Sequence, residues 1–366
     1  MKLYLIAGEA SGDLHGSNLI KALRRESPGV EIRAWGGDLM QAAGATLVKH
    51  YRDLAFMGFF EVVKNLRTIL RNIAFCKADV LDFQPDALVL IDYPGFNLRI
   101  AKWAKRRGIR VIYYISPQIW AWHQSRVHDI RRDVDKMLVI LPFEQDFYRK
   151  HGVEVAFVGH PLLDAVDSGR WTARHIVNRP PSTVALLPGS RRQEVSRILP
   201  AMLSVVRDFP EHEFVVAGAS ALPAEFYQPF LQGFENVRLV QGKTYELLAG
   251  AQAALVKSGT STLETALFGV PQVVCYAGNP ISFAIAKRVV DVKYISLVNL
   301  ILDRPLVREL IQGDLNRENL RAELAAILTS EKAADIRAGY AELREKLGAG
   351  GASARAAKKI TEFLAR

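Results

Sequence analysis

The second half of the sequence contains a loop whose residue types are suited to binding an anion. In LLPGSRRQEV (186–195), an apolar strand passes through a Pro-Gly turn into a helix that carries Arg191 near its start. The first amides and the dipole of a helix attract anions, and an arginine adds a bidentate donor. We therefore expect Gly189, Ser190 and Arg191 to contact a diphosphate.

A second strand-to-helix loop, LVKSGTSTLE, repeats this design. The residues Ser258, Gly259, Thr260 and Ser261 are suited to capping the helix or to holding a phosphate. Glu264 is placed to accept hydrogen bonds from vicinal hydroxyls such as those of ribose, and it also fits a plain capping-box carboxylate. Two such loops, with neither a dinucleotide glycine fingerprint nor a Walker lysine, predict a site for a nucleoside diphosphate.

The first half begins with a strand-to-helix turn that carries carboxylates instead. In LIAGEASGDLHG the glycines recur at every fourth position, and this spacing differs from the G-x-G-x-x-G of dinucleotide-binding loops. The negative charges of Glu9 and Asp13 argue against a phosphate at this turn. We expect Glu9 and Ser11 to face a cleft that takes a neutral, hydroxyl-rich ligand.

A further carboxylate ends the apolar strand of LVLIDYPGFN. Asp92 follows this strand directly, and the carboxyl ends of parallel strands face the ligand-binding crevice. Asp92 is therefore a candidate general base for a hydroxyl nucleophile, with the N-cap of the following helix as the alternative. Asp133 and Asp135 have the D-x-D spacing of some metal sites, but they precede a strand. We expect no metal and no other cofactor.

The segment FMGFFEVVKNLRTILRNI (56–73) has the pattern of an amphipathic helix. Lys64, Arg67 and Arg71 lie on one side of it, and a broad apolar stripe lies on the other. The stripe consists of Phe59, Val62, Val63, Leu66, Ile69, Leu70 and Ile73. Docking to a membrane surface or to acyl chains is one interpretation, and packing into the core is the other, which the pattern alone favours.

The composition is that of a globular chain with a basic surface. Its 366 residues, 49% of them hydrophobic, can bury a large core and favour two domains. The net charge of +10 indicates an anionic partner or an evenly solvated basic surface, and nucleic-acid-binding motifs are absent from the sequence. Two distant cysteines, and an N-terminus that enters a strand without a signal peptide, predict a cytoplasmic protein.

The elements that must position these residues alternate along the chain as strands and helices, which is the signature of doubly wound parallel sheets. The expected strands are LYLIA, IRAWG, ALVLID, RVIYYIS, KMLVIL and VAFVG, and then TVALLPGS, EFVVAGAS, VRLVQG, AALVKSG and QVVCYAG. The segment 159–181, which is charged and contains a double proline, is the expected linker. The sequence thus predicts an α/β fold of two Rossmann-like domains, 1–168 and 169–345, facing a cleft, with a last helix in 346–366.

Nine motifs follow one another along nearly the whole chain. They are AGEASGDLHG, MGFFEVV, IDYPGFN, SPQIWAW, ILPFEQDFY, FVGHPL, LPGSRRQEV, SGTSTLE and SLVNLI. In order and spacing they resemble the lipid A disaccharide synthases. The resemblance implies a glycosyltransferase of the B-type fold whose C-terminal helix packs back on the first domain. It implies an inverting transfer from UDP-2,3-diacylglucosamine to 2,3-diacylglucosamine 1-phosphate (lipid X), which gives lipid A disaccharide 1-phosphate and UDP.

The resemblance also implies roles for the carboxylates of the first half. Asp92 becomes the base that takes the proton of the acceptor hydroxyl, with Glu9 as its rival. Ser11 and Asp13 join Glu9 on the acceptor and sugar side. The motif IDYPGFN departs from the family at Gly95, where a second acidic residue is expected. This departure leaves Asp92 the more exclusive candidate.

On the donor side, the resemblance implies that Arg191 stabilises the departing UDP, that Glu264 contacts the ribose and that Asn299 lies near the donor. Acylated substrates shift the preference for the apolar stripe towards lipid contact, at the cytoplasmic face of the inner membrane. A homodimer stays open. Two alternatives also stay open, an enzyme like UDP-N-acetylglucosamine 2-epimerase and a non-catalytic binding protein for UDP-sugar or lipid.

Overall fold

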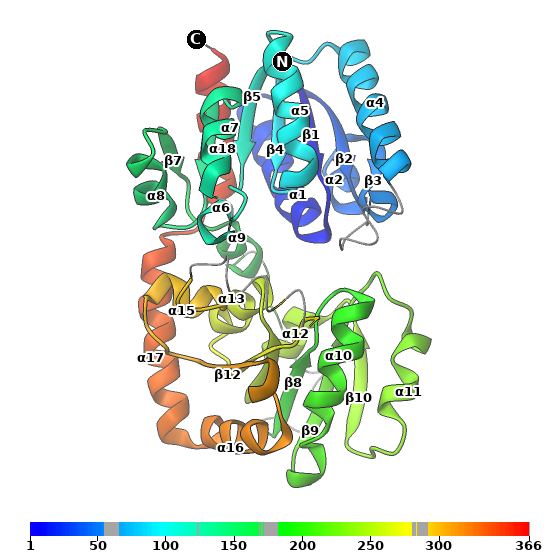
Figure 1. Cartoon of the computed structure of the whole chain (residues 1–366), viewed down its shortest axis with the longest axis vertical. Helices are drawn as coiled ribbons and strands as arrows, with labels where there is room; N and C mark the ends of the chain where they lie inside the picture. Colours follow the sequence, from blue (N-terminus) through cyan, green and yellow to red (C-terminus); the bar gives the residue numbers. More distant parts are fainter. Residues whose placement is uncertain are drawn as a thin grey trace. The chain divides into compact units, whose positions relative to one another are not determined.

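The chain folds into two α/β units, each built on its own parallel sheet (Figure 1). The computed structural model describes residues 1–54, 66–122, 124–167, 169, 171, 182–279, 283 and 292–365. Unit 1 comprises Met1–Asp164 together with Leu347–Arg366, and unit 2 comprises Ala165–Lys346. The linker expected at 159–181 lies partly outside the described residues. The prediction of an α/β fold with two Rossmann-like units is confirmed.

Unit 1 contains a seven-stranded sheet in the order β3-β2-β1-β4-β5-β6-β7. Its strands are β1 Lys2–Ala7, β2 Glu31–Gly36, β3 Thr46–His50, β4 Ala87–Ile91, β5 Arg110–Tyr114, β6 Lys136–Val139 and β7 Val155–Phe157. All its neighbouring strands pair in parallel. The central strand β4, ALVLI, is buried at every residue, as expected where helices cover both faces of a parallel sheet.

Helices flank this sheet on both faces (Figure 1). They are α1 Ala10–Glu26, α2 Asp38–Ala42, α4 Leu66–Phe83, α5 Pro94–Arg106, α6 Ile119–Trp122, α7 Val127–Asp133, α8 Glu144–Lys150, α9 Pro161–Asp167 and α18 Ala352–Leu364. Asp164, on α9, is the last residue of unit 1 before the chain passes into unit 2.

The C-terminal helix α18 packs on unit 1, where it contacts α1. The amides of Gly351 and Ser353, at its start, donate to the Asp164 carboxylate over 2.5 and 2.8 Å. Arg355 Nε donates to the carbonyl oxygen of Val158 over 2.8 Å. The two amide bonds to Asp164 satisfy backbone donors that a helix start otherwise leaves unpaired. The predicted return of the C-terminal helix to the first domain is therefore confirmed.

Unit 2 repeats the topology with six parallel strands in the order β10-β9-β8-β11-β12-β13. They are β8 Thr183–Leu187, β9 Glu213–Gly218, β10 Val237–Gln241, β11 Ala253–Lys257, β12 Gln272–Tyr276 and β13 Arg308–Ile311. Its helices are α10 Arg192–Leu203, α11 Gln228–Leu231, α12 Thr244–Leu248, α13 Thr260–Leu267, α15 Leu297–Leu302, α16 Arg317–Leu328 and α17 Ser330–Leu347. In both units the order of the strands reverses beside the first one, between β1 and β4 and between β8 and β11.

Candidate active site

The candidate residues of unit 1 gather at the switch point between β1 and β4. The parallel register pairs Ala7 with Ile91, so the turns that begin at Gly8 and Asp92 lie side by side. Doubly wound sheets bind ligands at this position, beyond the carboxyl ends of the strands. Glu9 follows Gly8 as the N-cap residue of α1, and Glu9 and Asp92 are both half-buried. The structure thus brings the two predicted carboxylates to one edge of the sheet.

The turn after β4, which carries Asp92, has a strained backbone that neighbouring side chains hold in place. Asp92 and Tyr93 both adopt the left-handed conformation, with φ of 45° and 50°, which costs about 1–2 kcal/mol for each such residue. The carbonyl oxygen of Asp92 accepts hydrogen bonds from Tyr113 Oη over 2.6 Å and from Asn97 Nδ2 over 2.7 Å. Strain of this kind persists at functional sites when the surrounding contacts enforce it. The buried Tyr113 and Asn97 therefore hold this turn in place.

The Tyr93 ring connects the two turns. A Cβ at Gly8 would lie only 2.3 Å from Tyr93 Cγ, so the ring rests directly on the glycine. The ring also stacks on Phe96, with their centroids 5.6 Å apart. Burial, and next the negative charge of Glu9, raise the pKa of Tyr93. One aromatic side chain thus contacts the first turn and stands next to Asp92 in the second.

Ser11 and Asp13 lie in the first turns of α1, and their surroundings differ. Ser11 is half-buried, whereas Asp13 is buried. The Asp13 carboxylate accepts hydrogen bonds from the amides of Gly37 over 2.8 Å, Met40 over 3.0 Å and Leu39 over 3.2 Å. These amides start α2, so Asp13 acts as a helix cap from a distant part of the chain. A contact between Asp13 and a sugar stays a prediction.

The candidate residues of unit 2 gather at the equivalent switch point. The register pairs Leu187 of β8 with Val256 of β11, so the PGSR and SGTST loops begin side by side. Gly189 has a φ of 114°, which favours glycine. A Cβ at this position would also lie 2.6 Å from Glu194 Oε2. The loop is therefore shaped so that a carboxylate approaches its backbone closely.

Glu194 reaches back from the first turn of α10 onto this loop. Its Oε2 accepts hydrogen bonds from the amides of Ser190 over 3.2 Å and Arg191 over 3.3 Å. Its Oε1 pairs with the Arg191 guanidinium at 3.2 Å and with the Lys257 ammonium at 2.9 Å. Burial alone would raise the pKa of Glu194, but Lys257 and Arg191 lower it below its usual range. The predicted anion-binding loop thus holds an ionised carboxylate of its own chain.

The SGTST loop leads from β11 into α13, with Gly259 as the N-cap residue and Thr260 and Ser261 as the first two helical residues. The Ser258 hydroxyl donates to the carbonyl oxygen of Ile295 over 2.8 Å. The first amides of α13 stand at the same sheet edge as those of α10, because β8 and β11 are neighbours. Both helix starts predicted to attract a diphosphate therefore lie together.

Glu264 lies in the second turn of α13 and is half-buried. Since Thr262 holds the third helical position, where a capping-box carboxylate stands, the structure excludes the capping-box alternative. Glu264 Oε1 accepts a hydrogen bond from Tyr245 Oη over 2.9 Å, and burial raises the pKa of this carboxyl. A contact between Glu264 and the ribose hydroxyls stays a prediction.

Asn299 is buried in α15, and its amide group bonds within the protein. Nδ2 donates to the carbonyl oxygen of Val307 over 2.8 Å and to Glu309 Oε1 over 2.9 Å, and Oδ1 accepts from the Val307 amide over 3.0 Å. Glu309 in turn accepts from the amide of Ile295 over 3.0 Å. Because Ile295 also binds Ser258, Asn299 supports the segment beside the SGTST loop. Direct contact of Asn299 with the donor stays a prediction.

The two aspartates with D-x-D spacing have separate partners. Asp133 is buried and accepts from Arg132 Nε over 2.8 Å. Asp135 accepts from the Val111 amide over 2.9 Å and pairs with Lys105. Within the described residues, no three or more His, Cys, Asp or Glu side chains gather where they could hold a metal ion.

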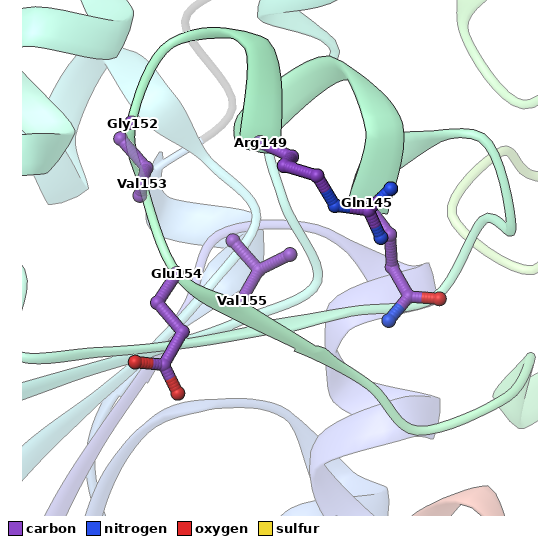
Figure 2. Close-up of a pocket in the computed structure, with 6 residues that line it drawn as sticks. All are labelled: Gln145, Arg149, Gly152, Val153, Glu154 and Val155. Carbon is purple, nitrogen blue, oxygen red and sulfur yellow. The ribbon is translucent and has the colours of Figure 1, made fainter.

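A surface hollow of about 460 Å³ lies beside α8 and the start of β7 (Figure 2). Its lining residues are Gln145, Arg149, Gly152, Val153, Glu154 and Val155. Most of them lie at the amino end of β7, whereas the switch-point loops lie at the carboxyl ends of the strands. We therefore exclude this hollow from the candidate active site.

The predicted apolar stripe lies partly outside the described residues. Outside them are Phe59, Val62 and Val63. Leu66 begins α4, and Arg67 and Leu70 are exposed on it. Ile69 packs half-buried against the core, and Ile73 is buried in it. The stripe is therefore divided, since Ile69 and Ile73 face the core and Leu70 faces solvent.

Sequence reasoning missed two polar side chains of unit 2. Lys257 pairs with Glu194, and Tyr245 donates to Glu264. Lys257 had a signal, because it is the one charged residue of the strand AALVK and stands at its carboxyl end. Tyr245 had no such signal, since its segment KTYELL reads as an ordinary helix start.

Comparison with known proteins gives a match over almost the whole chain. The family described as lipid-A-disaccharide synthetase matches residues 3–362. The lipid-A-disaccharide synthase of Syntrophus aciditrophicus is 43% identical over 364 residues, which cover 96% of this chain and 95% of that relative. The family match therefore includes both switch points and most of the C-terminal helix.

Solved structures share the fold at low sequence identity. The UDP-GlcNAc 2-epimerase from Neisseria meningitidis, bound to UDP-GlcNAc, aligns with a TM-score of 0.69 and 14% identity over 100% of both chains. The glycotransferase of kitacinnamycin aligns with a TM-score of 0.67 and 16% identity over 99% of this chain and 98% of that chain. These similarities show the two-unit fold alone, whereas the family match rests on sequence. The chain belongs to the lipid-A-disaccharide synthetase family.

Proposed function

We propose that the chain transfers a diacylglucosaminyl group from UDP-2,3-diacylglucosamine to the 6-hydroxyl of 2,3-diacylglucosamine 1-phosphate. The products are the β-1,6-linked lipid A disaccharide 1-phosphate and UDP. The observation that carries this proposal is the family match over residues 3–362. The relative from Syntrophus aciditrophicus, 43% identical, has the name of this activity. Family membership makes the chain a glycosyltransferase.

In this proposal, unit 1 activates the acceptor. The Asp92 carboxylate takes the proton of the 6-hydroxyl while the hydroxyl oxygen forms its bond to the anomeric carbon of the donor. Support comes from the strained turn that Tyr113 and Asn97 hold, because a general base requires a fixed position. Glu9 is the rival base, since it stands at the same sheet edge. Comparison of Asp92→Asn with Glu9→Gln separates the two.

Unit 2 binds the donor in this proposal. As the bond between the anomeric carbon and the diphosphate oxygen breaks, the electron pair leaves with UDP, and the added negative charge falls on the diphosphate. The starts of α10 and α13 and the Arg191 guanidinium supply positive potential there. Support comes from the neighbouring positions of the two loops at the β8–β11 switch point. Glu264, half-buried beside Tyr245, is the proposed partner of the ribose hydroxyls.

We further propose that the outer face of α4 contacts the membrane that carries the acylated substrates, at the cytoplasmic face of the inner membrane. Of the four large hydrophobic side chains exposed among the described residues, three are on α4: Leu70 at 54%, Phe75 at 48% and Leu81 at 44%. Arg67 and Arg71, also exposed, stand at the start of this helix, where cations attract anionic head groups. The outer face therefore combines apolar area with positive charge.

The opposite face of α4 is fixed to the sheet. Ile73, Cys76 and Val80 are buried in the core of unit 1. Asp79 accepts hydrogen bonds from Tyr4 Oη over 2.6 Å and from Arg33 Nη1 over 2.8 Å. These contacts keep the outer face turned to solvent. Within the part of the chain that the structure describes, no helix has the length and apolar character of a membrane span.

Product analysis tests the transferase proposal. The purified chain is incubated with donor and acceptor together and with donor alone, and products are identified by mass spectrometry and ³¹P NMR. Disaccharide 1-phosphate and an equal amount of UDP, formed only with both substrates, support the proposal. A C2 epimer formed from donor alone would instead show an epimerase, for which the fold similarity is the present support. Donor that binds and is recovered unchanged would show a carrier.

A liposome assay tests the membrane proposal. The variant with Leu70→Ser and Leu81→Ser should sediment less with anionic liposomes, because each exposed side chain contributes about 25 cal/mol per Å² of apolar area that it buries. Its melting temperature should stay close to that of the wild type, since both residues are already exposed. Leu39→Ser is the matched control, because Leu39 is 47% exposed on α2. Equal losses of liposome binding in the variant and the control would refute a role specific to α4.

A further inference from the structure

We propose that Lys257 is a second cation of the donor diphosphate site, held in place by Glu194, and that it makes this site prefer a diphosphate over a monophosphate. This inference rests on the proposed function, in which unit 2 binds a UDP-sugar. Lys257 ends β11, at the edge of the sheet where the two candidate phosphate loops begin.

The Lys257 ammonium lies between the two loops. It is 2.9 Å from Glu194 Oε1, and the other oxygen of that carboxylate accepts the amides of Ser190 and Arg191 in the first loop. It is also 3.7 Å from where a Cβ at Gly259 would stand, in the second loop. Its side chain keeps 21% of its exposure, so it is not fully enclosed by the protein. A phosphate held by either loop would come within reach of this charge.

Lys257 also changes the charge balance of this site. Arg191 and Lys257 both pair with Glu194, at 3.2 and 2.9 Å, so the three side chains together carry one net positive charge. Without Lys257, Arg191 and Glu194 would form a neutral pair. Each helix start adds only about half an elementary charge, whereas a bound diphosphate ester carries at least two full negative charges. The attraction of the cluster for a diphosphate therefore depends strongly on Lys257.

The Lys257 ammonium keeps bonding capacity for a ligand. A lysine ammonium has three N–H donors, and the bond to Glu194 uses one of them. A phosphate oxygen can therefore accept from Lys257 while Glu194 continues to orient it. Glu194 prepositions the cation for the ligand.

Binding measurements on Lys257→Met test the proposal. Isothermal titration calorimetry on the full chain compares UDP, UMP and uridine. UDP should bind about tenfold more weakly or worse, since a charge-assisted hydrogen bond contributes about 1.5–3 kcal/mol. The loss of affinity should be smaller for UMP, and the affinity for uridine should be unchanged. The UDP affinity of the variant should also depend less on salt concentration than that of the wild type. Lys332→Met, on the exposed side of α17, is the control that removes the same charge elsewhere in unit 2.

A double-mutant cycle separates ligand contact from a purely structural role. If Lys257 binds the diphosphate itself, Lys257→Met weakens UDP binding in a Glu194→Gln background as well, and Lys257→Arg retains much of the affinity. If Lys257 acts only by pairing with Glu194, the loss disappears in that background, and the proposal is overturned. Equal UDP affinity in Lys257→Met and wild type also overturns it. If the wild type binds no UDP, the proposed donor itself is refuted. If the wild type binds UDP but forms no disaccharide, only the transferase proposal is refuted.

Discussion

The contact between Gly8 and Tyr93 leads to a prediction about the geometry of the Asp92 turn. In Gly8→Ala the new Cβ would lie 2.3 Å from Tyr93 Cγ, whereas ordinary contacts begin at 3.4 Å. The ring must therefore move by about 1 Å. It cannot swing away freely, because it stacks on Phe96 and its own backbone is held in the left-handed conformation. The displacement should therefore pass to the neighbouring Asp92.

The expected result is a loss of turnover larger than the loss of stability. Overpacking of this kind costs about 1–3 kcal/mol of unfolding free energy. Misplacing a catalytic group by about 1 Å costs on the order of a hundredfold in rate. Steady-state kinetics of disaccharide formation and urea denaturation measure the two effects. UDP affinity should stay unchanged, because Gly8 belongs to unit 1.

Two further variants control this test. Gly95→Ala adds the same methyl group in the first turn of α5. Apart from the chain neighbours and the backbone of the helix itself, no atom of the described residues lies within 4 Å of the new Cβ, so its activity should stay near that of the wild type. Tyr93→Asn removes the ring and keeps a residue type that tolerates the left-handed conformation. In the Tyr93→Asn background, Gly8→Ala should cause little further loss of turnover. If Gly8→Ala causes the same loss of turnover in the Tyr93→Asn background as in the wild type, the reasoning is refuted. Full activity of Gly8→Ala alone would refute it too.

Three other predictions concern charged groups. Asp92→Asn should lower kcat by about 10²–10⁴-fold and leave UDP affinity intact, and a larger loss in Glu9→Gln would make Glu9 the base. Arg191→Ala should lower turnover by about a hundredfold or more, with an unchanged circular dichroism spectrum, because a leaving-group donor is lost. Burial raises the pKa of Glu144 from 4.5 to about 7. A raised carboxyl pKa gives stability that is complete below pH 4.5 and lost as the pH rises through 7, so wild type should lose roughly 3 kcal/mol of unfolding free energy over this range relative to Glu144→Gln. Denaturant titrations at several pH values measure this, and parallel curves for the two proteins would contradict it.

The central strands and the loops after them were predictable because buried parallel strands are continuous apolar runs. Two strands at sheet edges were not expected from the sequence. β3, TLVKH, and β13, RELI, contain charged residues and have a strand partner on one side. Edge strands tolerate such residues, so their sequences lack the apolar signal. The loops at the switch points were identified all the same, since they follow central strands.

Side-chain roles were harder to predict than loop positions. The sequence gives Asp13 and Asn299 as polar residues in suggestive motifs, but it cannot tell that their polar atoms bond to Gly37, Val307 and other groups of the chain. These partners are distant in sequence, so tertiary packing decides the roles. The apolar stripe was ambiguous for a related reason. Because α4 has apolar residues on both sides, helical periodicity could not determine which side faces the core.

The two switch points share a topology and carry opposite charges, and this contrast supports the division of labour proposed for the two units. At the β1–β4 edge stand the carboxylates Glu9 and Asp92, which suit a neutral hydroxyl that must lose a proton and would repel a diphosphate. At the β8–β11 edge stand Arg191 and Lys257, with Glu194 between them, and they suit a leaving group that gains negative charge. Exchanging the two sets of residues would place a base beside the leaving group and cations beside the acceptor hydroxyl. Loops of equal position in one topology therefore perform different chemistry because their charges differ.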